Sequence, residues 1–118
     1  MYQFYFEKLE VWQNARGLVK SVYSVSRFFP KAEQFGITSQ IRRSSMSIAS
    51  NISEGVSRYT KKDKARFMVL AFGSAMETIN HLILAKDLEY LSEQEYINLR
   101  KDLQLITNQL NALHKSLT

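Results

Sequence analysis

A strict apolar repeat near the C-terminus constrains the fold of this chain more than any other feature. Large apolar side chains recur there at alternating spacings of three and four residues, at Tyr96, Leu99, Leu103, Ile106, Leu110, Leu113 and Leu117. This 3.5-residue period places them all along one face of an α-helix. Such a seam is the geometry of nearly parallel helices in a bundle or a coiled coil.

Three further segments show helical periodicity, and breakers of helices are rare. The 118 residues include one proline and four glycines. Pro30 ends the first periodic segment, and the run from Ser92 to Glu95 forms a capping box that starts the last one. We therefore expect an all-α chain with helices at about residues 8–29, 38–57, 61–90 and 93–116. Short connections favour a single-domain, up-down-up-down four-helix bundle.

The composition indicates a globular protein in a reducing compartment. Apolar residues make up 45% of the chain, charged residues 23%, and cysteine is absent. The N-terminus lacks a basic region followed by an apolar run, so no secretory signal is expected. No stretch approaches about 18 uninterrupted apolar residues, the length that spans a membrane. We expect a cytoplasmic protein that does not contact a membrane.

The third predicted helix is apolar over most of its circumference. Besides the stripe that would face the bundle, it carries a second stripe at Met68, Phe72, Met76, Ile79 and Ile83. A helix of this kind is either central or in contact with another subunit. Because a four-helix bundle has no central helix, the second stripe predicts an interface in a homo-oligomer.

The second predicted helix, at residues 38–57, is unusually rich in serine. Serine is a mediocre helix former because its hydroxyl competes for backbone hydrogen bonds. Two interpretations are open, and we weigh them equally. The small side chains could permit a close contact between helices, or they could form a solvated polar face.

The net charge of +5 is concentrated in one segment. Residues 38–66 contain seven cations and two acids, whereas the rest of the chain holds nine of each sign. Five of these cations form the basic cluster, at Arg58, Lys61, Lys62, Lys64 and Arg66. Such a local excess favours an anionic partner.

The basic cluster lies where a helix should begin. A helix start carries a partial positive charge, so lysines there are electrostatically disfavoured unless an anion such as phosphate docks beside them. The cluster therefore predicts contacts with RNA or DNA, and Arg42 is a further candidate. A solvated lysine-rich turn is the alternative interpretation.

The sequence contains no recognisable catalytic arrangement. His81 and His114 are isolated, and we expect His81 to be a satisfied core or interface residue. There is no metal-ligand spacing, glycine-rich phosphate loop or nucleophile motif, so neither a cofactor nor a metal is expected. We predict a protein that is not an enzyme.

Several short motifs resemble a known family. They are Leu9-x-Val-Trp-x-x-Ala15, Phe35-Gly36, Gln40-x-Arg42-Arg43, Ser47-Ile48-x-x-Asn51-Ile52-x-Glu54-Gly55, Arg58, Phe67 and Ala71-x-Gly73-Ser74-x-x-Glu77. Together they cover nearly the whole chain. They resemble the four-helix-bundle proteins encoded within intervening sequences of 23S ribosomal RNA. That family is similar to the accessory variability protein of diversity-generating retroelements.

The resemblance implies a homopentameric barrel with a basic surface, and it offers no catalytic residues to carry over. For the accessory protein, the implied partners are nucleic acid and a reverse transcriptase. The leading hypothesis is an oligomeric bundle that binds RNA or DNA through phosphate contacts. The alternative is a scaffold that binds an acidic protein, such as a reverse transcriptase, without touching nucleic acid.

Overall fold

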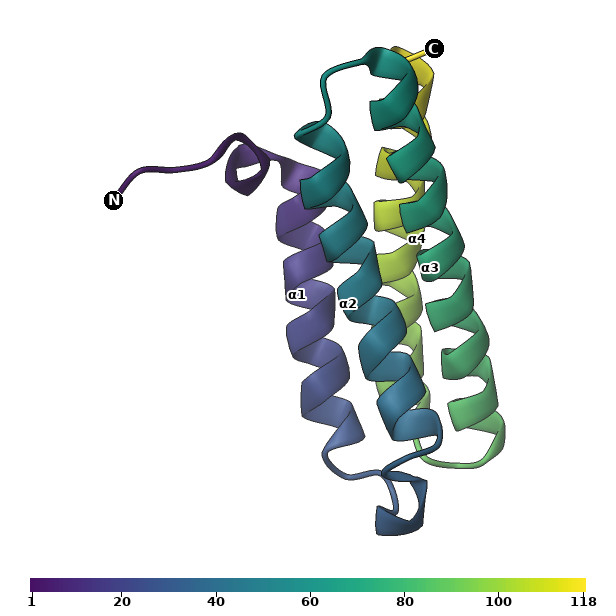
Figure 1. Ribbon diagram of the computed structural model, residues 1–118. Helices are drawn as coiled ribbons and strands as arrows, with labels where there is room; N and C mark the ends of the chain where they lie inside the picture. Colours follow the sequence, from purple (N-terminus) through teal and green to yellow (C-terminus); the bar gives the residue numbers. More distant parts are fainter.

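The computed structural model describes residues 1–118 and contains four α-helices and no strand, which confirms the all-α prediction (Figure 1). Two short 3-10 helices, η1 and η2, precede α1 and α2. The bounds are η1 Tyr5–Lys8, α1 Glu10–Ser26, η2 Lys31–Glu33, α2 Ile37–Val56, α3 Lys61–Asp87 and α4 Glu93–Ser116.

The four helices form a bundle in which consecutive helices run in alternating directions (Figure 1). Each helix packs against the next along the chain, and α4 closes the bundle against α1. The connection between α2 and α3 lies at the same end as the C-terminus, and the connections after α1 and α3 lie at the other end (Figure 1). The molecule measures 43 × 31 × 23 Å, and its long axis corresponds to the length of α3 at 1.5 Å per residue.

Helix α1 is shorter at both ends than the expected residues 8–29. Leu9 is extended, with φ −79° and ψ 127°, so the residues before it form the separate η1 turn. Beyond Ser26 the backbone tightens, because Phe28 and Phe29 donate to carbonyls three residues back. Phe29 then turns inward and packs against Tyr90, with ring centroids 5.6 Å apart.

The other helix ends follow local chemistry. Helix α2 begins at Ile37, one residue before its expected start, and the N-cap residue Gly36 provides no side-chain cap. Helix α3 stops at Asp87 rather than near residue 90, because Glu89 adopts a positive φ of 63° that reverses the chain. Helix α4 begins at the capping box of Ser92 and its partner three residues later.

The α2–α3 packing explains part of the serine content. Ser44 and Ser45 are almost completely buried, so at these positions the small side chain allows close helix contact. Ser50, by contrast, is exposed, as a solvated face would require. At the end of the helix, a Cβ added to Gly55 would clash with Cβ of Phe67 and lie 2.7 Å from Cε of Met68. The two helices therefore approach each other closely at Gly55.

Helix α3 is long and apolar enough to cross a membrane when judged by length and composition alone. An 18-residue window has a mean hydropathy of 1.4, and 33% of that window is buried inside the bundle. A helix in the core of a soluble protein passes the same test, so this property is weak evidence for a membrane span.

Candidate nucleic-acid interface

The basic cluster lies at the junction between α2 and α3. After α2 ends, the Ser57 hydroxyl donates to the carbonyl of Glu54 at 2.6 Å and closes the last turn. The Thr60 hydroxyl then accepts from the backbone N–H of Asp63 at 3.1 Å and caps α3. These two local bonds fix the turn that carries Arg58 and Tyr59 between the helices.

The two arginines of the cluster are held by the protein itself. The guanidinium carbons of Arg58 and Arg66 both lie 4.6 Å from the centre of the Phe67 ring. Both side chains also pair with Asp63, at 3.7 Å from Nε of Arg58 and at 3.0 Å from Nη2 of Arg66. Arg58 additionally pairs with Glu54 at 3.5 Å. The arginines therefore cover the end of the core, and their charge is largely balanced.

The three lysines of the cluster are in a different situation. Lys61, Lys62 and Lys64 form no salt bridge, and the first two are exposed. They surround the first turn of α3, where backbone N–H groups add a partial positive charge. The ring of Tyr59 beside them is fully exposed and contacts no other aromatic ring. The turn between α2 and α3 and the start of α3 therefore present three unpaired lysines and one exposed aromatic side chain.

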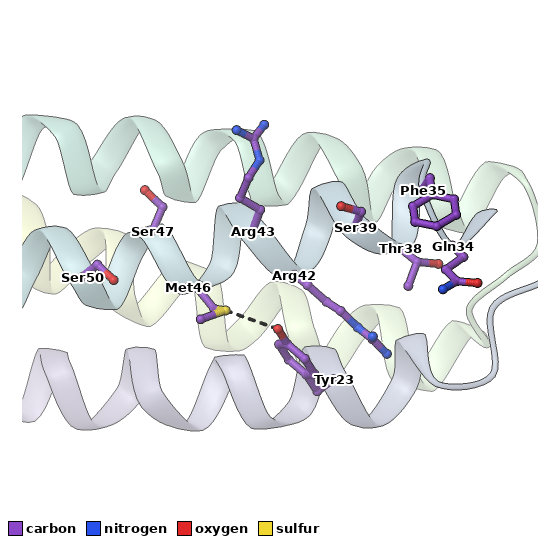
Figure 2. Close-up of a pocket in the computed structure, with 10 residues that line it drawn as sticks. All are labelled: Tyr23, Gln34, Phe35, Thr38, Ser39, Arg42, Arg43, Met46, Ser47 and Ser50. Carbon is purple, nitrogen blue, oxygen red and sulfur yellow. Dashed lines mark hydrogen bonds between the residues drawn. The ribbon is translucent and has the colours of Figure 1, made fainter. Parts of the chain in front are cut away.

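Arg42 is not part of this surface. It lies near the other end of α2, fourteen residues before Val56, which corresponds to roughly 20 Å along the helix. Its Nε donates to the hydroxyl of Ser26 at 2.8 Å, and its guanidinium lies 4.6 Å from the Tyr23 ring centre. Figure 2 shows Arg42 reaching toward Tyr23 on α1. The structure therefore separates Arg42 from the basic cluster with which the sequence grouped it.

The residues expected at an oligomer interface divide into three groups. Met68 is only 1% exposed and belongs to the core of the bundle, so its assignment to an interface was wrong. Phe72 and Ile79 are partly buried against the core on the side facing α4. Met76 and Ile83 are exposed by 40% and 39%. The period of the helix could not reveal which members of the stripe reach α4.

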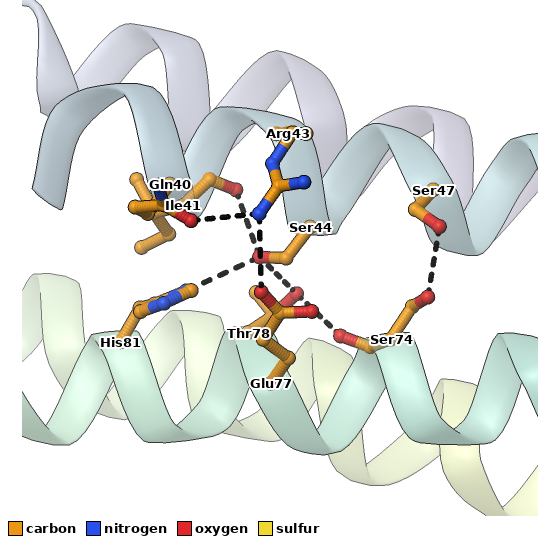
Figure 3. Close-up of polar contacts among 9 residues, drawn as sticks. All are labelled: Gln40, Ile41, Arg43, Ser44, Ser47, Ser74, Glu77, Thr78 and His81. Carbon is orange, nitrogen blue, oxygen red and sulfur yellow. Dashed lines mark hydrogen bonds and ion pairs between the residues drawn. The ribbon is translucent and has the colours of Figure 1, made fainter. Parts of the chain in front are cut away.

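His81 participates in a polar network between α2 and α3 (Figure 3). Its Nδ1 lies 3.3 Å from the Ser44 hydroxyl, which also accepts from the Thr78 hydroxyl at 2.9 Å. Burial lowers the pKa of His81, Arg43 lowers it further, and Glu77 opposes them. His81 is therefore a satisfied residue at a helix contact, as its sequence context predicts.

Other ionisable groups form no cluster that points to a reaction. No group of three His, Asp or Glu side chains is placed to hold a metal ion. Tyr90 donates to Glu33 at 2.9 Å, and this hydrogen bond raises the pKa of the tyrosine. That contact joins η2 to the connection between α3 and α4.

Comparison with known proteins identifies the family. A family model described as the 23S rRNA-intervening sequence protein matches residues 7–112. The chain belongs to the 23S rRNA-intervening sequence protein family. The resemblance found in the sequence motifs is thereby confirmed. The matched range contains the basic cluster, Arg42, helices α1 to α3 and most of α4.

A solved structure has the same fold as this member of the 23S rRNA-intervening sequence protein family. It is a protein of unknown function from the S23 ribosomal protein family of Bacteroides thetaiotaomicron, with a TM-score of 0.83. The two sequences are 24% identical, and the match covers 89% of this chain and 98% of the other. At this identity the likeness establishes the fold alone. A comparison with curated proteins gave no match.

Proposed function

We propose that this protein is a non-enzymatic, cytoplasmic homo-oligomer that binds RNA or DNA through phosphate contacts. The observation that carries the proposal is the unpaired charge of Lys61, Lys62 and Lys64 around the start of α3. Lysines next to a helix N-terminus repel its partial charge, and a phosphate group relieves that repulsion. We expect no strong sequence preference, because phosphate contacts carry no sequence information directly.

The arginines have a smaller role in this proposal than the lysines. Arg58 and Arg66 already contact Asp63 and Phe67, so binding a phosphate would compete with existing ion pairs. Tyr59 is fully exposed beside the lysines and offers a ring on which an unpaired base can stack. This combination favours single-stranded nucleic acid or strand ends over a duplex groove.

Assembly is the second part of the proposal. We propose that a second copy of the chain covers the exposed stripe around Met76 and Ile83, and that five copies close a ring. Support comes from the 3-4-3-4 spacing of Val69, Phe72, Met76, Ile79 and Ile83, which continues an apolar stripe beyond the bundle's own core. A ring would repeat the three lysines in each subunit and raise avidity without a new type of contact.

The experiment that tests binding is a salt titration followed by fluorescence anisotropy, with single-stranded RNA and DNA of mixed sequence. Wild type is compared with a variant that carries Lys→Gln at 61, 62 and 64. Affinity should fall linearly with salt on logarithmic axes, and the variant's slope should be shallower by about 2 to 3, since each phosphate contact contributes about 0.7–0.9.

The matched control carries Lys→Gln at Lys20, Lys31 and Lys101, three exposed lysines on α1, η2 and α4 that lie away from the α2–α3 connection. It loses the same net charge from other surfaces and should keep the wild-type slope. If both variants lose the same slope, binding reflects overall charge and not the α3 start. If wild type binds neither nucleic acid at about 100 mM salt, the scaffold that binds an acidic protein becomes the better hypothesis.

A further inference from the structure

A second candidate site lies between α1 and the first half of α2, away from the basic cluster. It is an open pocket of about 690 Å³, lined by Tyr23 of α1, by Phe35 before α2, and by Thr38, Ser39 and Arg42 of α2, among others (Figure 2). This volume is in the range of sites for small molecules. The pocket lies on α1 and α2, and none of its lining residues belongs to the α3 stripe.

Arg42 is positioned like a binding residue for an anion. Its Nε is held by Ser26, and its guanidinium is stacked against Tyr23, so the side chain is already ordered. It forms no ion pair, and its two terminal amino groups have no acceptor in the protein. Arg43, Arg58 and Arg66, by contrast, each pair with a carboxylate. An ordered guanidinium without an acid is well suited to bind phosphate.

The start of α2 adds further donors that lack partners. Gly36 provides no side-chain cap, and the first turn contains no acid. Gln40 is the first residue whose backbone N–H bonds within the helix, so the N–H groups of residues 37–39 have no acceptor. A helix of twenty residues with such a free start favours an anion.

The hydroxyl of Thr38 points to a ligand independently of the helix start. The residue is only 8% exposed, and its Oγ1 is the one buried side-chain polar atom without a hydrogen-bond partner. Buried polar groups in proteins are nearly always satisfied, so such an atom requires an explanation. Thr38 lines the pocket, and its oxygen points toward the end formed by Gln34 (Figure 2).

The ring of Phe35 extends the pocket beyond a simple phosphate site. It is 89% exposed, and it lies directly before the free start of α2. An exposed aromatic ring next to phosphate-binding donors is an arrangement on which a nucleotide base stacks. The other aromatic side chain of the pocket, Tyr23, is already covered on one face by Arg42.

We propose that this pocket binds a 5′-phosphorylated nucleotide, either free or at the end of a strand. The phosphate lies between Arg42 and the start of α2, where Thr38 contributes its hydroxyl, and the base stacks on Phe35. This site is separate from the three lysines, so it goes beyond the proposed binding of nucleic acid along the α3 start. Its chemistry favours a terminal phosphate monoester over an internal phosphodiester, because a monoester presents more negative charge and more free acceptor oxygens to Arg42 and the start of α2.

The test is a titration of ¹⁵N-labelled protein with adenosine 5′-monophosphate, inorganic phosphate and adenosine, followed by NMR in buffer without phosphate. The monophosphate should shift the amides of residues 37–39 and the Nε–H of Arg42. It should bind about tenfold more tightly than inorganic phosphate, the gain expected from one stacked base. Adenosine without phosphate should bind at least tenfold more weakly than the monophosphate.

Three variants separate the contributions. Arg42→Lys keeps the positive charge but loses the planar guanidinium, so it should weaken the binding of the monophosphate by about tenfold or more. Phe35→Ala should bind the monophosphate no better than inorganic phosphate. The variant with Lys→Gln at 61, 62 and 64 should bind the monophosphate like wild type, which distinguishes failure here from failure of the lysine surface. The spectrum of each variant reports whether it is folded.

Two short strands identify the source of the nucleotide. A tetranucleotide with a 5′-phosphate should bind more tightly than the same strand with a 5′-hydroxyl. If it also binds more tightly than the monophosphate, the pocket takes strand ends; if it binds more weakly, the pocket takes free nucleotides. The proposal is overturned if adenosine and its monophosphate bind equally, if Arg42→Lys has no effect, or if the shifts lie at residues 57–64.

Discussion

His81 shows how burial changes the behaviour of a single residue. In this protein it is partly buried and lies against Ser44, at the contact between α2 and α3. Its pKa is lowered from 6.5 chiefly because burial disfavours the charged imidazolium. Arg43 acts in the same direction, and Glu77 acts against it. The neutral ring is therefore the form that fits the folded protein.

This residue predicts a pH-dependent stability. Because the pKa of His81 is lower in the folded chain than in the unfolded chain, the unfolded chain binds a proton first as the pH falls. The free energy of unfolding should therefore be unaffected by His81 above about pH 6.5 and should decrease as the pH falls below that value. Thermal unfolding of wild type at pH 7.5 and 5.5 measures this decrease, and His81→Gln should reduce it.

The control for this measurement is His114→Gln, at the C-terminal end of α4. That variant removes a histidine that has no hydrogen-bond partner in the bundle and should retain the wild-type decrease. If both variants lose the decrease equally, or if His81→Gln retains it fully, burial of His81 is not the cause.

At the scale of helices, the approach of α2 to α3 depends on the absence of a side chain at Gly55. A Cβ at this position would clash with Phe67, whose ring lies under two arginines, and would press on Met68. Phe67 cannot move outward without displacing those arginines, and Met68 cannot move inward because it is fully buried. The helix end and the basic cluster therefore depend on the same contact.

Gly55→Ala should destabilise the protein by about 1–3 kcal/mol, the usual effect of overpacking a core. Gly17→Ala on α1 is the control, since a Cβ there meets nothing within 4 Å. That change should stabilise the protein by about 0.5–1 kcal/mol, because alanine is the better helix former. Urea unfolding of both variants gives the comparison, and equal effects would exclude the close approach as the reason for glycine.

Periodicity in the sequence predicted the helices because the period is a local property. The seam from Tyr96 to Leu117 and the capping box at Ser92 needed no knowledge of other segments. The helix ends at Leu9 and Glu89 were missed because an extended backbone at Leu9 and a positive φ at Glu89 leave little trace in residue type.

The candidate sites were harder to predict, because they depend on contacts between segments. The pairing of Asp63 with Arg66 has the three-residue spacing of helix neighbours and could have been read from the sequence. The position of Phe67 beneath Arg58 could not, since it follows from the turn between α2 and α3. Likewise, Arg42 meets Tyr23 only because α1 and α2 pack side by side.

For the whole molecule, α3 presents exposed apolar side chains on two sides. Met76 and Ile83 lie on the side facing α4, and Leu70 and Leu84 lie on the other side of the helix, with exposures of 39–45%. Met76 and Ile83 share their stripe with Phe72 and Ile79, which are partly buried against the core. Leu70 and Leu84 have no such apolar neighbours on their side of the helix. We therefore expect the first pair to hold the oligomer together.

Replacing both Met76 and Ile83 with glutamate should dissociate the oligomer, because assembly would bury two carboxylates without partners in an apolar contact. Light scattering coupled to gel filtration gives the mass of each species. The matched control replaces Leu70 and Leu84 with glutamate, at nearly the same exposure on the same helix. The assignment of the stripe is wrong if the control alone dissociates, or if wild type is already a monomer.

One carboxylate governs how much positive charge the α3 end of the molecule offers to a partner. Asp63 holds both Arg58 and Arg66, so only the three lysines beside it are available. A change of this single acid to its amide would release Arg66 and leave Arg58 paired with Glu54 alone. The cap from Thr60 would remain, because it uses only the backbone of residue 63. Relatives could thus acquire very different affinities for polyanions by one substitution that leaves the fold intact.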